Sequence, residues 1–103
     1  MTTGLFGCNT YSFLRAEPAA DSVARLAARG FREFELMVHP GHLSPDMPKP
    51  ELARLRALFA GDVSLTTLNM PNIDINVAAA AAEMRRHSLR MLTDVVRLAG
   101  ELG

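Results

Sequence analysis

Polar side chains that could bind a ligand or transfer a proton occur at the ends of three apolar, strand-like runs. The candidates are Asn9 and Tyr11 in the first run, Glu35 and His39 at the second, and Asn69 after the third. Amide, phenol, carboxylate and imidazole groups exchange hydrogen bonds with hydroxyl and carbonyl groups. The carboxyl ends of parallel strands meet at one edge of a sheet, where the ligand sites of such sheets lie. The sequence therefore predicts a ligand site in which these five side chains are neighbours.

Glu35 lies inside the apolar run 31–38, where an ionised carboxylate is costly unless it is paired or bound to a metal. One interpretation makes it a site carboxylate. The other makes it a strand residue that forms an ion pair with a neighbouring basic side chain.

His39 and His42 flank Pro40 and Gly41 in the loop after this run. Their imidazole nitrogens could bind a metal or carry protons. An H-x-x-H pair has neither the spacing of a zincin helix nor that of a zinc finger, so the alternative is two solvent-exposed loop histidines.

Asn69 directly follows the third run, where its amide could bind a hydroxyl or carbonyl oxygen or form a turn before Pro71. Further polar residues follow in the same loop. Asn72, Asp74 and Asn76 have the character of turn and helix-cap residues, and Asn76 suits the N-cap of the helix after it.

The strand-like runs cover residues 5–11, 31–38 and 63–68, and each is followed by a helix-patterned stretch. The first helix should begin at Pro18, with the Asp21 side chain as an acceptor for free N–H groups, and end at Gly30. The second is expected over 52–59. The third should begin in the alanine run 78–82, because alanine favours helix strongly.

These units predict an α/β fold with parallel strands and outer helices. Parallel strands joined through helices need cover on both faces, and three units are too few to close a barrel. Residues 1–103 are therefore predicted to be a single partial domain, the first three βα units of a larger barrel. Long polar loops on one edge of the sheet and short turns on the other are typical of βα enzymes.

Composition narrows the class of protein. Lysine plus arginine equals aspartate plus glutamate at 11 each, so the zero formal charge argues against nucleic acid or an anionic membrane as partner. The single cysteine excludes an internal disulfide, and neither a 20-residue apolar run nor a secretory signal is present. A cytoplasmic location is expected. Dinucleotide, P-loop and serine-hydrolase motifs are missing.

Three segments together carry a resemblance to a known family. They are the G-F-R-E-F-E-L segment 30–36, the L-N-M-P-N-I-D-I-N segment 68–76, and the M-R-R-H-S and L-A-G-E-L-G segments of the last helix. This pattern resembles the xylose isomerase-like TIM-barrel superfamily, which includes sugar-phosphate isomerases/epimerases and the endonuclease IV-type enzymes of AP endonuclease family 2. The resemblance covers the whole chain and corresponds to the first three of eight units.

The resemblance implies a carbohydrate substrate and a divalent metal (Mn, Mg, Co or Zn) held by Glu, Asp and His side chains. In the family's isomerases two glutamates from later strands move a proton next to a carbonyl, and the metal stabilises the enediolate. Glu35, His39, Asn69, Asn9 and Tyr11 would then be substrate-binding residues, with the catalytic residues and most metal ligands outside this chain. Some members have a histidine where this sequence has Asn69. This chain alone is expected to be inactive.

Two alternatives to a sugar isomerase/epimerase remain. One is a DNA-repair endonuclease on the same barrel. The other is a non-catalytic βα module that acts through association, since unpaired sheet edges favour self-association.

Overall fold

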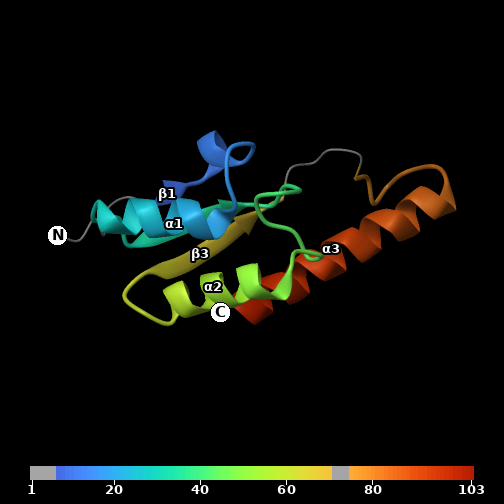
Figure 1. The fold of residues 1–103 in the computed structure, drawn as a ribbon. Helices are drawn as coiled ribbons and strands as arrows, with labels where there is room; N and C mark the ends of the chain where they lie inside the picture. The colour runs from blue at the N-terminus through green and yellow to red at the C-terminus, as the bar shows by residue number, and fades with distance from the viewer. Residues whose placement is uncertain (1–6, 71–74) are drawn as a thin grey trace.

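Three parallel strands form one open sheet in the order β1–β2–β3, and an α-helix follows each strand in the chain. The computed structural model describes residues 7–70 and 75–103. The elements are β1 (Cys8–Asn9), a short 3-10 helix η1 (Tyr11–Phe13), α1 (Ala19–Ala28), β2 (Glu33–Met37), α2 (Lys49–Phe59), β3 (Ser64–Asn69) and α3 (Ala82–Leu102) (Figure 1). The predicted α/β class and parallel strands are confirmed.

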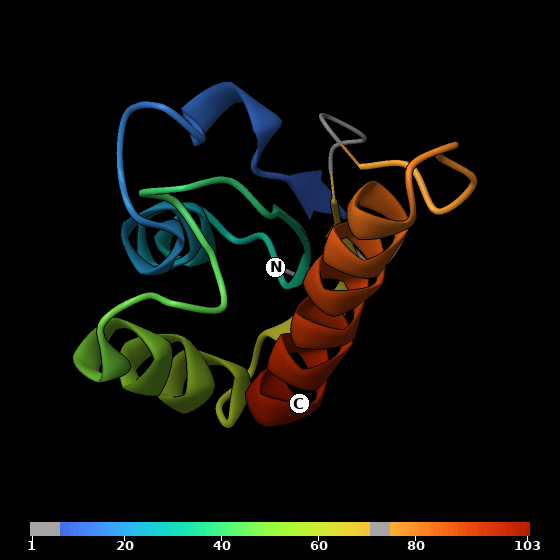
Figure 2. The ribbon, with the colours of Figure 1, turned by 90° about the vertical axis from the view of Figure 1, so that its right-hand side faces the viewer.

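The core lies between the sheet and the helices. Phe34 and Leu36 of β2 are fully buried. They belong to one apolar cluster with residues of all three helices, including Val23 of α1, Leu55 of α2 and Leu98 of α3. The helices pack in chain order, α2 against both α1 and α3 (Figure 2). Complete burial of a leucine or phenylalanine side chain stabilises by about 2 kcal/mol, so this cluster fixes which face of the sheet the helices cover.

The register between β2 and β3 contains a β-bulge. Phe34 pairs with Leu65 but Glu35 pairs with Thr67, so Thr66 is the extra residue. The Thr66 hydroxyl donates to the Phe34 carbonyl oxygen at 2.9 Å. A bulge reverses the alternation of side chains along a strand. As a result Leu65 and Leu68 both contact the core, whereas Thr67 is exposed.

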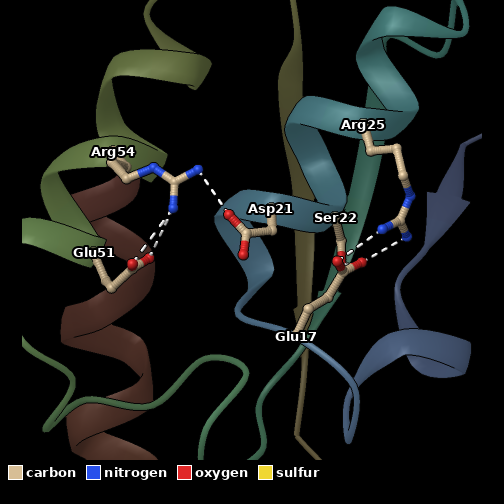
Figure 3. Close-up of polar contacts among 6 residues, drawn as sticks. All are labelled: Glu17, Asp21, Ser22, Arg25, Glu51 and Arg54. Atoms are coloured by element: carbon tan, nitrogen blue, oxygen red, sulfur yellow. Dashed lines mark hydrogen bonds and ion pairs between the residues drawn. The ribbon is translucent and has the colours of Figure 1, made fainter.

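Ion pairs join α1 to α2 and close the turn before α1 (Figure 3). Arg54 of α2 contacts Asp21 at 2.8 Å and Glu51 at 3.4 Å. Glu17 binds Arg25 and accepts a hydrogen bond from the Ser22 hydroxyl at 2.8 Å. The prediction that Asp21 caps α1 is wrong, since its carboxylate pairs with Arg54 and α1 has no side-chain cap.

The main chain of His42, rather than a side chain, caps the start of α1. Its carbonyl oxygen accepts from the Ala19 N–H at 2.8 Å. Its ring is fully buried, with Nδ1 at 2.7 Å from the Glu17 carbonyl oxygen and Nε2 at 2.9 Å from the Thr10 hydroxyl. Because a carbonyl only accepts, Nδ1 carries the proton and Nε2 accepts from Thr10. The interpretation of His42 as an exposed loop histidine is therefore wrong.

Several predicted element bounds also change, and the second helix begins three residues early, at Lys49. The first strand is shorter than expected, because the chain turns into η1 at Tyr11; residues 5 and 6 lie outside the described ranges. The third helix begins at Ala82, the last residue of the alanine run, and its N-cap is Ala81 rather than Asn76. The Asn76 side chain instead accepts from the Ala78 N–H at 2.9 Å, and a local turn competes with helix at this point.

α3 is the longest helix, and its first turns project beyond the sheet (Figure 1). Val95, Leu98 and Leu102 are buried in its C-terminal half, while residues 82–87 are exposed. Among the described residues, no helix is both long enough and apolar enough to cross a membrane.

The His42 network predicts a pH-dependent stability. Burial lowers the pKa of His42, and its titratable neighbours are Glu17 and His39. The folded pKa lies below that of the unfolded chain, so the unfolded chain binds the proton first as the pH falls through about 6.5. We expect the free energy of unfolding to fall by at most about 1.4 kcal/mol per pH unit between pH 6.5 and the folded pKa. Urea unfolding between pH 5.5 and 7.5 measures this.

The variant His42→Leu should lose this pH dependence and be less stable at pH 7.5, because the Glu17 carbonyl and Thr10 hydroxyl lose a partner at a cost of about 1–3 kcal/mol. The exposed His87 on α3 offers a matched control, and His87→Leu should keep the dependence. An unchanged pH dependence in His42→Leu would show that another group is responsible.

Candidate functional site

Three side chains lie in register across the exposed face of the sheet, one from each strand. Asn9 pairs with Glu35, and Glu35 pairs with Thr67. The Asn9 side-chain amide donates to Glu35 Oε1, and the Thr67 hydroxyl donates to Glu35 Oε2 at 2.8 Å. We call Asn9, Glu35 and Thr67 the polar row. Both carboxylate oxygens of Glu35 are thus held by neutral donors.

Neighbouring backbone groups orient the polar row. The Asn9 Oδ1 accepts from the Tyr11 N–H at 2.7 Å, so its amide nitrogen must point the other way, to Glu35. On the other side of the site, Asn69 ends β3 and its carbonyl oxygen accepts from the Val38 N–H at 2.8 Å. The sharp turn into η1 and the pairing of β2 with β3 therefore set the positions of the two asparagines.

Hydrogen bonds lower the pKa of Glu35. The largest contribution comes from Thr67, followed by Asn9, and a smaller one comes from the Asn69 side chain; partial burial acts in the opposite direction. Glu35 is therefore ionised at neutral pH. Of the two sequence interpretations, an ion pair with a basic strand neighbour is wrong for the described residues, where Glu35 forms no salt bridge.

The structure brings together three of the five predicted site residues, Asn9, Glu35 and Asn69. Tyr11 contributes its backbone N–H, while its side chain is 67% exposed. His39 lies apart, in a pocket between the β2–α2 loop and α3. Asn72 and Asp74 lie outside the described residues.

Sequence reasoning missed Thr67, although a signal for it exists. Leu65 and Leu68 are three positions apart inside a strand, whereas side chains on one face of a regular strand are two apart. Two core-facing leucines at that spacing require a bulge between them. The bulge then turns Thr67 toward the face that carries Glu35.

The polar row suits binding better than proton transfer. A general base works best with a pKa near the operating pH, and the pKa of Glu35 is lowered instead. An ionised carboxylate flanked by amides can accept from one ligand hydroxyl while an amide donates to another. Within residues 7–70 and 75–103, no three His, Cys, Asp or Glu side chains are grouped so as to hold a metal ion. The resemblance implies a divalent metal whose ligands lie mostly outside this chain, and the residues of the polar row do not by themselves form such a ligand set.

The contribution of Thr67 is measurable. In Thr67→Val the pKa of Glu35 should rise toward its ordinary value, because its largest stabilising hydrogen bond is lost. NMR titration of the Glu35 carboxyl carbon gives this pKa. The ionised Glu35 stabilises the fold at neutral pH, and this contribution should disappear as the pH falls through the folded pKa of Glu35. In Thr67→Val the contribution should be lost at a higher pH.

Thr93→Val provides the matched control. The Thr93 hydroxyl bonds within α3 to the Leu89 carbonyl, so its removal should leave the pKa of Glu35 unchanged. Equal pKa values of Glu35 in Thr67→Val and the unsubstituted chain would contradict the assigned hydrogen bond.

Neither a protein-family model, nor a curated protein, nor a solved structure matches the chain. Its function is therefore inferred from the contacts of its own residues.

Proposed function

We propose that this chain is the substrate-binding N-terminal portion of a sugar or sugar-phosphate isomerase/epimerase with a (βα)8 barrel. The observation that carries the proposal is the ionised Glu35, held between the donors of Asn9 and Thr67 across three parallel strands. In this reading the chain binds carbohydrate hydroxyls, and the residues that transfer the proton are not among those described.

The chemistry of the polar row favours a polyhydroxylated ligand. Each carbohydrate hydroxyl both donates and accepts one or more hydrogen bonds, so an acceptor flanked by amide donors complements it. Glu35 supplies the acceptor, and the Asn9 and Asn69 amides lie beside it. A uniformly acidic or basic surface would select ions instead, and the other members of the row are neutral.

The uncovered face of the sheet also supports a barrel. Parallel sheets usually have both faces covered, and here the helices cover only one. In a closed barrel the other face becomes the interior, with ligand groups at its carboxyl end. The polar row and Asn69 lie on the face that would become that interior.

A ligand titration tests this proposal on the chain itself. With D-fructose as the probe, the backbone amide signals of Asn9, Glu35 and Thr67 should shift together and saturate, with Kd on the order of 10 mM for so open a site. Glu35→Leu, which removes both acceptor oxygens, should abolish the shifts. Glu33→Leu, two residues earlier on the same strand and outside the row, is the matched control and should keep them.

Activity gives a second readout. The chain with D-fructose and added Mn²⁺ should show no turnover, because the lowered pKa of Glu35 makes it a poor base. Turnover would contradict the assignment of proton transfer to other residues. Absence of saturable shifts would contradict the carbohydrate site.

One observation favours the association module as a second candidate. β3 is an edge strand of the sheet. The neighbouring helix α3 exposes Leu89, Leu92 and Val96 at 55%, 37% and 71%, and their spacing of three and four places them on one side of it. We call these three residues the α3 flank. A free strand edge beside an apolar helix face is suited to self-association.

Self-association is expected to depend on the α3 flank. The double variant Leu92→Lys/Val96→Lys should sediment as a monomer at concentrations where the unsubstituted chain associates, since two buried cations would oppose the contact. His87→Lys places a lysine on the opposite side of α3, at an exposed position, and should associate as before. Sedimentation equilibrium measures all three, and a monomeric unsubstituted chain at about 100 µM would argue against this candidate.

A further inference from the structure

A hollow lies between the β2–α2 loop and α3, and no residue of the polar row lines it. Its volume is ≈ 500 Å³, within the ~300–1,000 Å³ typical of small-molecule pockets. We call it the α3 pocket. Its walls are mainly apolar: Val38, Pro40, Pro45, Met70, Ile75 and Met91.

The polar groups around these walls offer hydrogen-bond acceptors. Asp46 and Asp94 each present a carboxylate. The Ser44 hydroxyl donates its proton to Asp46 at 2.6 Å, which leaves Ser44 Oγ as an acceptor. His39 Nδ1 lies 2.9 Å from the Pro40 carbonyl oxygen, which only accepts, so Nδ1 is the nitrogen that donates there.

The surface beside the α3 pocket carries more carboxylates than cations. A shallower hollow shares Pro45, Asp46 and Asp94 with it and adds Glu101 and Arg97. Arg97 is 75% exposed and reaches Asp94 only at 3.9 Å, an exposed contact that neutralises little. Three carboxylates therefore face one weakly engaged cation along this groove.

We propose that the α3 pocket binds a small protonated amine with an apolar body. The ammonium group would donate to Asp94 and Asp46, whose carboxylates keep acceptor sites beyond their contacts with Arg97 and Ser44, and the apolar body would cover the methionine and proline walls. A neutral apolar ligand would leave the negative charge of these carboxylates unmatched, and an anion would be repelled by it. The proposal is independent of the carbohydrate site, because no residue of the polar row lines this pocket.

Binding of 2-phenylethylamine tests the proposal, with 2-phenylethanol as the neutral analogue of the same shape. Isothermal titration and backbone NMR should show saturable binding of the amine with Kd on the order of 1 mM. The shifted amides should be those of residues 38–46 and of α3 around Met91 and Asp94. The alcohol should bind roughly fivefold more weakly, the effect of one partly exposed charge contact.

Paired variants separate charge from shape. Asp94→Asn keeps the shape and should weaken amine binding roughly fivefold without affecting the alcohol. Asp62→Asn removes the same charge at an exposed site in the turn before β3 and should leave binding unchanged. Met91→Ala opens the pocket wall and should weaken the binding of both ligands. Val96→Ala, on the α3 flank, should weaken the binding of neither.

Three results would overturn the proposal. Equal binding of alcohol and amine would make this an apolar pocket without charge selection. Unchanged amine binding in Asp94→Asn would place the ammonium group elsewhere. No saturable amine binding up to about 20 mM would exclude an amine site of the expected affinity.

Discussion

The register between β2 and β3 determines both faces of the sheet. With Thr66 as the extra residue, Leu65 and Leu68 both lie against the helices, and Thr67 and Asn69 fall on the face that carries Glu35. A regular strand would send one leucine into solvent or one polar residue into the core. Burial of the leucines therefore selects the bulged register, and the same register supplies the donor that holds Glu35.

A second constraint fixes the loops at the carboxyl ends of the strands. The buried ring of His42 joins the end of β1 to the turn before α1. The main-chain carbonyl of His42 takes the place of a side-chain cap on α1. The Thr10 hydroxyl also accepts from the Met37 N–H, so one buried hydroxyl connects both strands to this loop. The polar row is thus built beside a buried network in which every described buried side-chain nitrogen and oxygen has a hydrogen-bond partner.

Much of the fold and part of the site follow from local patterns. Apolar periodicity placed three strands and three helices, and Gly30 ends the first helix region at a φ of 104° as a C-terminal glycine does. The patterns failed where a local competitor was available. Asn76 forms a turn in an alanine-rich segment, and Tyr11 begins a 3-10 turn where a strand was expected, because neither position has the packing that would extend the element.

The sequence alone determined the α/β class, the order of the elements and the presence of polar residues at the strand ends, since these depend on residue types a few positions apart. Tertiary structure alone decided which of those residues meet. Glu35 lies 26 positions from Asn9 and 32 from Thr67, and only strand register brings them into contact. It also gave two histidines only three positions apart different surroundings. His39 lines the α3 pocket, whereas the buried ring of His42 links the end of β1 to the turn before α1. Their difference depends on what packs around each ring, and that is a property of the folded chain.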